Sequence, residues 1–117
     1  MKEMILVIRP EQLEVLKDIL DGFHAGGMTI SSVMGCGTQR GFATENTVNQ
    51  IKGFKTIINL LPKIRVEVVV PNDMVEEIIT EVRDRMATNR VGDGKIFIRT
   101  IDDAVRIRTG ERGDAAL

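Results

Sequence analysis

Two apolar runs, residues 4–8 (MILVI) and 64–70 (IRVEVVV), constrain the fold of this chain most. The first is continuously apolar, and the second alternates around Arg65 and Glu67 before it becomes wholly apolar. Short runs rich in valine and isoleucine are typical of β-strands that are covered on one or both faces. A helical pattern follows each run, so the sequence predicts two strand–helix units.

The two predicted helices are marked by their starts, ends and apolar spacing. Pro10 suits the first turn of a helix, and Asp21–Gly22 suits its end. Asn72 or Asp73 is expected to cap the second helix. Apolar residues recur at helical spacing in both segments, which predicts one core-facing side on each helix. These residues are Leu13, Leu16, Ile19 and Leu20 in the first helix, and Val75, Ile78, Ile79, Val82 and Met86 in the second.

Extended segments are also predicted at residues 28–34, 57–61 and 96–98. Residues 35–56 contain several glycines among polar residues and keep neither a helical nor a strand period, so a long loop is expected there. The resulting order, strand, helix, strand, long loop, strand, helix, strand, predicts an α+β fold. The expected architecture is a ferredoxin-like βαββαβ sandwich, a single domain over residues 1–117.

Right-handed crossovers place both predicted helices on one face of the sheet. The other face has no helix to cover it, although the strands at 4–8 and 64–70 present apolar side chains to both sides. A large exposed apolar patch is unusual for a soluble monomer. We therefore expect this face to be buried by self-association with closed cyclic symmetry.

Composition excludes several classes of protein. A formal net charge of −1 gives no basic field for nucleic acid. No apolar run approaches the roughly 20 residues that span a bilayer, and the N-terminus does not resemble a signal peptide, so a cytoplasmic protein is expected. The single cysteine, Cys36, allows no internal disulfide and no thiolate cluster for zinc. His24 lies in a predicted turn without a partner at catalytic spacing, and no nucleophile and base pair is recognisable.

Three polar clusters are candidates for binding an anion. Residues 92–95 (GDGK) combine glycines, whose amides can approach an oxyanion closely, with a lysine. Residues 35–41 (GCGTQRG) form a second glycine-rich cluster after a strand. Arg106 and Arg108 alternate, which would put both guanidinium groups on one side of an extended segment. Each cluster alone is also compatible with a tight turn or a solvated edge, but together the three suit a nucleotide.

These clusters belong to a longer resemblance. The stretches IRPEQLEVLKDIL, GGMTISSV, GCGTQRG, LLPKIRVEVVVP, TNRVGDGKIFI and VRIRTGERGDAAL occur in order along nearly the whole chain. The chain thus resembles the PII signal-transduction proteins of nitrogen metabolism. The resemblance implies a homotrimer that binds ATP or ADP in clefts between subunits. It also implies three named loops: a T-loop at about 37–56, a B-loop at about 87–95 and a C-loop at about 101–117.

The resemblance further implies which residues hold the ligands. In the family, 2-oxoglutarate binds beside the ATP phosphates through Mg²⁺, which Gln39 would hold here. Gln39, Arg40, Gly41 and Lys63 would bind 2-oxoglutarate. Many members carry an aromatic residue at Cys36 and an arginine at Thr38, which leaves the preference between ATP and ADP open. The implied nucleotide-binding residues are Gly27, Met28, Thr29, Gly35, Cys36, Gly37, Thr38, Gln39, Glu67, Val69, Thr88, Gly92, Asp93, Gly94, Lys95, Arg106 and Arg108.

The T-loop of the family engages target proteins, such as an ammonium transporter or glutamine synthetase. Lys52 and Phe54 would contact the partner here, and a membrane would be met only through a transporter. The chain contains no tyrosine, so the tyrosine uridylylation known in the family is excluded. Two alternatives remain open at this point. One is a PII-like adenine-nucleotide sensor with a different effector or target, and the other is a small hydrolase on the ferredoxin-like fold.

Overall fold

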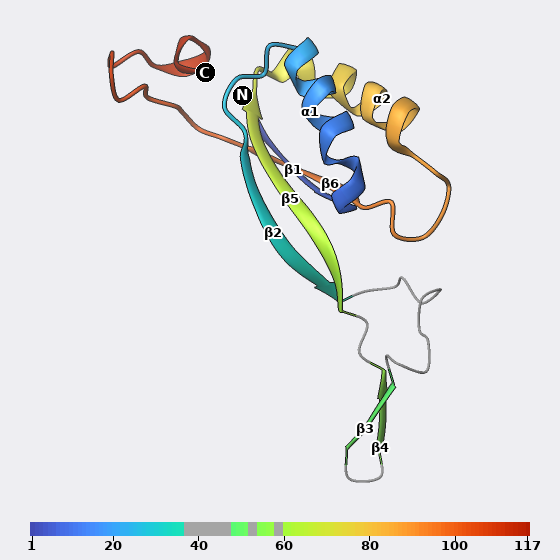
Figure 1. Ribbon diagram of the computed structural model, residues 1–117. Helices are drawn as coiled ribbons and strands as arrows, with labels where there is room; N and C mark the ends of the chain where they lie inside the picture. The colour runs from blue at the N-terminus through green and yellow to red at the C-terminus, as the bar shows by residue number, and fades with distance from the viewer. Residues whose placement is uncertain (37–47, 52–53, 58–59) are drawn as a thin grey trace.

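The computed structural model describes residues 1–36, 48–51, 54–57 and 60–117, of which residues 48–51 and 54–57 are described by their backbone only. A four-stranded antiparallel sheet has two helices on one of its faces (Figure 1). The strand order is β2-β5-β1-β6, and the helices connect β1 to β2 and β5 to β6. The predicted α+β, ferredoxin-like architecture is confirmed. The bounds are β1 (Lys2–Ile8), α1 (Leu13–Gly22), β2 (Thr29–Cys36), β5 (Leu60–Val70), α2 (Val75–Met86) and β6 (Lys95–Thr100).

The hydrophobic core lies between the helices and the sheet. Alternate residues of β1 and β5 point toward the helices, because side chains alternate between the faces of a strand. Leu16 and Leu20 of α1 and Ile78 of α2 meet them and are fully buried. Ile79, which was predicted on the buried side of α2, is only partly buried and packs against the core. The core residues from the two strands are Met4, Leu6, Ile8, Val66, Val68 and Val70.

Both helices begin differently from the prediction. Residues Pro10–Gln12 and Asn72–Met74 each form a single 3-10 turn before the α-helix starts. The N-cap of α2 is Met74, and no side-chain hydrogen bond caps this end of the helix. The predicted cap by Asn72 or Asp73 is therefore wrong. Asn72 and Asp73 lie within the 3-10 turn and therefore not at the N-cap position of α2. Such turns are frequent at helix N-termini.

The face of the sheet that has no helix is mixed rather than apolar. Ile5 and Val7 do lie on it, as predicted, together with Phe97. Phe97 is opposite Ile5 in the register of β1 with β6 and is 53% exposed. Charged residues share this face, however, as two ion pairs. Arg65 pairs with Glu67 at 3.0 Å, and Arg99 pairs with Glu3 at 2.6 Å. The apolar side chains predicted for this face are therefore present, and two ion pairs lie among them.

The long loop predicted at residues 35–56 contains regular structure. β2 continues to Cys36, and two further strands, β3 (Val48–Ile51) and β4 (Phe54–Ile57), form an antiparallel pair. The sequence does contain a signal for this pair. Two short segments with β-branched or aromatic residues flank the two residues Lys52–Gly53, which is typical of a hairpin.

β5 is a single strand of 11 residues that runs through Pro62, not two separate segments. Its pairing with β1 ends at Ile64, so residues Leu60–Lys63 pair only with β2. Proline lacks the amide that a second neighbouring strand would need. Pro62 is therefore tolerated where one edge of β5 has no partner strand. Among the described residues, no helix is long and apolar enough to cross a membrane.

The turn after α1 generates the first prediction. His24 has φ of 53°, a left-handed conformation that costs a non-glycine residue about 1 kcal/mol. Its neighbour Ala25 donates its amide to the carbonyl of Leu20 at 3.0 Å, which closes the end of the helix. We expect His24→Gly to raise the free energy of unfolding by about 0.5–1 kcal/mol in urea denaturation at fixed protein concentration. His24→Ala, which keeps the unfavourable φ, should give no such gain; an equal gain would contradict this explanation.

Candidate functional site

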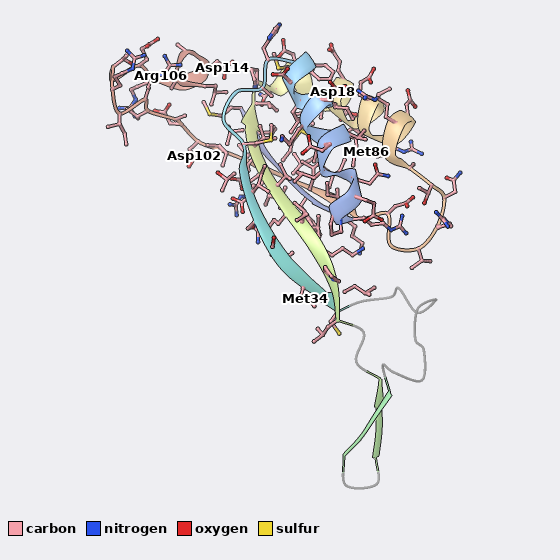
Figure 2. All side chains as sticks on the ribbon, viewed as in Figure 1. Asp18, Met34, Met86, Asp102, Arg106 and Asp114 are labelled. Atoms are coloured by element: carbon pink, nitrogen blue, oxygen red, sulfur yellow. The ribbon has the colours of Figure 1, made fainter. Side chains whose placement is uncertain are left out.

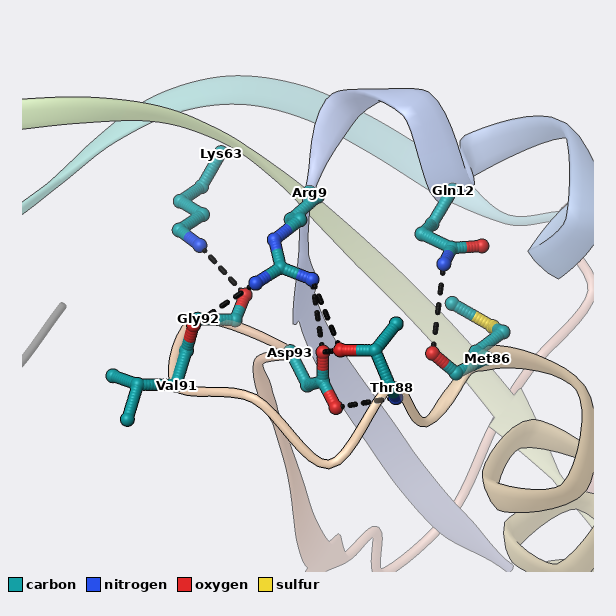
Figure 3. A network of polar contacts seen from close by, with 8 residues as sticks. All are labelled: Arg9, Gln12, Lys63, Met86, Thr88, Val91, Gly92 and Asp93. Carbon is teal, nitrogen blue, oxygen red and sulfur yellow. Dashed lines mark hydrogen bonds and ion pairs between the residues drawn. The ribbon is translucent and has the colours of Figure 1, made fainter. Parts of the chain in front are cut away.

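The candidate site is built on the loop of residues 87–94 between α2 and β6, which we call the glycine loop. β1 and β6 pair antiparallel, with Val7 opposite Lys95. The end of the glycine loop therefore lies close to the residue that follows β1, which is Arg9. Nη1 of Arg9 donates to Oδ1 of Asp93 at 2.9 Å, and Nη2 donates to the carbonyl oxygen of Val91 at 2.9 Å (Figure 3).

Asp93 also ties the loop to its own beginning. The amide of Thr88 donates to Oδ2 of Asp93 at 2.7 Å, and the hydroxyl of Thr88 donates to Oδ1. These hydrogen bonds, with that of the Thr88 hydroxyl the largest influence, hold the pKa of Asp93 below its usual range, and the Arg9 guanidinium adds to the effect. The carboxylate thus remains ionised and joins both ends of the loop.

The carbonyl groups of the loop point toward two cations. Nζ of Lys63 donates to the carbonyl oxygen of Gly92 at 2.9 Å, next to the Val91 carbonyl held by Arg9 (Figure 3). Burial, chiefly, and the nearby Arg9 lower the pKa of Lys63. In a trans peptide the N–H points opposite to the C=O, so the amides of Gly92 and Asp93 face away from these cations. Within the described part of the chain, neither amide donates a hydrogen bond.

Two successive amides that point the same way form a concave site for an anion. Gly92 and Gly94 have φ of 102° and 103°, a region that residues with a Cβ rarely adopt. At Gly94 a Cβ would also lie 2.0 Å from the carbonyl oxygen of Val7. The glycines are thus required by the backbone path, and Lys95 follows them as an exposed cation at the start of β6.

A hollow of about 550 Å³ brings two of the predicted clusters together. Gly35 and Cys36 at the end of β2 line it, together with the end of the glycine loop and Lys63. These segments are far apart along the chain, and the sheet order β2-β5-β1-β6 brings them to the same end of the sheet. Its lining residues are Val7, Gly35, Cys36, Leu61, Lys63, Arg90, Val91, Gly92, Asp93, Gly94, Lys95 and Phe97.

A second hollow, of about 490 Å³, contains most of the remaining predicted residues. Arg106 lines it, with its guanidinium bound to Glu111 at 3.2 Å and to the carbonyl oxygen of Leu117 at 3.0 Å. Figure 2 shows Arg106 on the C-terminal segment, away from the helices. No described residue lines both hollows. The second is lined by Glu3, Gly26, Gly27, Thr29, Glu67, Val68, Val69, Arg106, Ala116 and Leu117.

Three described residues of the predicted set, Met28, Thr88 and Arg108, line neither hollow. Met28 packs, partly buried, against the core. Arg108 is exposed in a turn in which the amide of Gly110 donates to the carbonyl of Arg106 at 2.7 Å. The extended segment predicted for Arg106 and Arg108 is therefore wrong. The chain reverses there, because Gly110 adopts φ of 74° and an isolated bridge joins Val105 to Arg112.

Several predictions lie outside the described residues. These are the roles of Gly37, Thr38, Gln39, Arg40, Gly41 and Lys52. Phe54 begins β4, and only its backbone is described. Among the described residues, no group of three or more His, Cys, Asp or Glu side chains could hold a metal ion.

Arg9 is the residue of this site that the sequence interpretation missed. The sequence shows only that Arg9 directly follows the apolar strand at residues 4–8. Its contact with Asp93 depends on the pairing of β1 with β6, which the sequence pattern does not contain. Thr88, which is predicted to bind nucleotide, contacts Arg9 and Asp93 in the ligand-free chain.

These features define a class: a small α+β protein of ferredoxin-like fold with a glycine loop and a hollow at one end of the sheet. The family model described as nitrogen regulatory protein P-II matches residues 1–111. The nitrogen regulatory protein P-II 2 of Methanothermobacter thermautotrophicus is 42% identical over 117 residues, 100% of this chain and 97% of that protein. The P-II protein of Bradyrhizobium diazoefficiens is 38% identical over 113 residues, covering 97% and 96% of the two chains. GlnK of Escherichia coli is 35% identical over the full length of both. This chain belongs to the P-II family of nitrogen regulatory proteins.

The close approach at Gly94 gives the second prediction. Gly94→Ala would place a methyl group against the Val7 carbonyl, so we expect a loss of about 3 kcal/mol or more in the free energy of unfolding. Gly110→Ala is the matched control, because it has positive φ of 74° but nothing within 4 Å of the position that the added methyl group would take. It should cost only about 1 kcal/mol. Equal losses in chemical denaturation would show that the Val7 contact does not matter.

The Asp93 carboxylate gives the third prediction. Its pKa is lowered on folding, so its contribution to stability is present above the unfolded pKa of about 4 and is lost as the pH falls toward the folded pKa. At pH 7 the parent should be more stable than Asp93→Asn, and the difference should shrink below about pH 4. Thr88→Val, which removes the main hydroxyl donor, should behave similarly. A difference that stays constant from pH 7 to pH 3 in denaturation curves would contradict it.

Proposed function

We propose that this protein is a PII-type signal transducer that binds ATP or ADP between the subunits of a homotrimer. The observation that supports this most is the division of the implied nucleotide-binding residues into two hollows. One contains Gly35, Cys36 and Gly92–Lys95, and the other contains Gly27, Thr29, Glu67, Val69 and Arg106. A nucleotide can contact both sets of residues if the first hollow of one subunit lies against the second hollow of its neighbour.

The chemistry of the two hollows is complementary. The amides of the glycine loop and the ammonium of Lys95 suit the phosphates. The second hollow offers Thr29 and the carboxylate of Glu67, which can accept a hydrogen bond from an exocyclic amine such as that of adenine. The C-terminal segment supports contact with another copy, because Ile107 is fully exposed and Val105 is about half exposed.

The proposed effector is 2-oxoglutarate, bound next to the nucleotide. Lys63 lies in the first hollow with a side chain able to pair with a carboxylate. Mg²⁺ usually binds through few protein ligands together with substrate oxygens, which fits a site in which Gln39 is the protein ligand and the nucleotide phosphates supply others. Gln39, Arg40 and Gly41 complete the effector site in this proposal.

The proposed output is control of a nitrogen-metabolism protein in the cytoplasm, such as an ammonium transporter or glutamine synthetase. The T-loop, with Lys52 and Phe54, would make the contact. The relatives named above are regulatory proteins by description, which supports a regulator over a hydrolase.

The fourth prediction tests the shared cleft. Titration calorimetry with ATP and with ADP, each with and without 2-oxoglutarate and Mg²⁺, should show nucleotide binding to a protein whose mass by light scattering is that of a trimer. Lys95→Ala and Arg106→Ala remove one cation from each hollow, and each should weaken ATP binding by at least about tenfold.

The control is Arg85→Gln, which removes an exposed ion pair with Asp18 between the two helices. It should bind ATP like the parent. A stable monomer, or a Lys95→Ala, Arg106→Ala double variant that binds ATP as tightly as the parent, would overturn the proposed function. Nucleotide binding without any effect of 2-oxoglutarate would overturn the effector assignment alone.

A further inference from the structure

We infer that Arg9 is the positioning residue of the glycine loop: it holds the loop carbonyls so that the opposite amides stay aimed at the phosphates. This inference rests on the proposed function for its ligand, but its geometry comes from the ligand-free chain. No motif of the glycine loop itself includes Arg9, which lies about 80 residues earlier in the chain.

Arg9 contacts the loop at three places along its length. Its guanidinium reaches Thr88 near the start at 3.5 Å, the Val91 carbonyl in the middle at 2.9 Å and Asp93 near the end at 2.9 Å. The side chains of Arg9 and Asp93 are only 15% and 24% exposed. A partly buried, charge-assisted pair resists solvent better than a surface ion pair does. One side chain therefore fixes the path of the whole loop.

Arg9 is itself held in place by its neighbours in sequence. It follows β1, a central strand of the sheet, and its backbone has φ of −65° and ψ of 144°. A residue before proline is restricted to this extended region, so Pro10 limits the backbone of Arg9. The guanidinium is thus presented from a rigid base.

Arg9 acts on the carbonyl side of the loop and not on the proposed nucleotide phosphates. It does not line either of the two large hollows, whereas Val91, Gly92 and Asp93 line the first. Its donors are directed at the Val91 carbonyl and the Asp93 carboxylate, on the side opposite to the Gly92 amide. Removing Arg9 would therefore leave every proposed ligand contact present but no longer aligned.

Arginine suits this role better than lysine. Its planar fork serves two separated acceptors at the same time, whereas an ammonium is a point charge. Arg9→Lys should keep the bond to Asp93 and lose the one to Val91. Its effect should consequently lie between those of the parent and of Arg9→Gln.

The fifth prediction compares Arg9→Gln, Arg9→Lys and the control Arg85→Gln in the full-length protein. Calorimetry should show ATP binding about tenfold weaker in Arg9→Gln, partly restored in Arg9→Lys and unchanged in Arg85→Gln. The loss should be larger for ATP than for AMP, because the loop amides face phosphates. A purely structural role of Arg9 would not produce this dependence on the number of phosphates.

A second measurement, without nucleotide, separates this inference from the proposed function. The ¹⁵N order parameters of the Gly92 and Asp93 amides should fall in Arg9→Gln, which reports motion that the parent lacks. Combining Arg9→Gln with Asp93→Asn should weaken ATP binding less than the sum of the two single effects. If the parent binds no nucleotide, the proposed function fails, while lower order parameters would still support positioning by Arg9. Unchanged order parameters, or unchanged ATP binding in a variant of a nucleotide-binding parent, would overturn the inference.

Discussion

The contact between the central strand β1 and the edge strand β6 determines the site. β1 and β6 pair so that the backbone entering β6 passes directly against the Val7 carbonyl, and only a residue without a Cβ fits at Gly94. That pairing places Arg9 beside Asp93, and the Asp93 carboxylate then closes the loop onto Thr88. The apolar residues of β1 that face the helices bury this strand in the core, so the packing of the fold and the geometry of the loop depend on the same segment.

Much of the fold could be predicted from the sequence, because its signals are local. The apolar spacing of Leu16, Leu20 and Ile78 predicts the buried side of each helix, and the alternation around Arg65 and Glu67 predicts a strand with two different faces. Predictions were wrong where a local pattern was compatible with more than one backbone. Arg106 and Arg108 alternate as in a strand, but glycines and the bridge to Arg112 reverse the chain instead.

The candidate site was predictable only in part, and for a different reason. Glycines and a lysine indicate a loop that approaches an anion, so residues 92–95 could be identified directly. The meeting of this loop with Gly35 and Cys36 depends on the order of strands in the sheet, which a local pattern does not contain. Arg9 depends on register as well, because a shift of one residue would direct its side chain to the other face. The division of functional residues between two hollows is likewise a property of the folded chain.

The length of β5 has one further consequence. Beyond Ile64 the strand leaves β1 and continues with β2 alone, as a ribbon only two strands wide (Figure 1). Lys63 is the first residue of that ribbon, and its ammonium is bound to the Gly92 carbonyl. This hydrogen bond connects the base of the ribbon to the glycine loop, whose amides are proposed to bind the phosphates. Lys63 therefore joins the base of the two-stranded ribbon directly to the glycine loop.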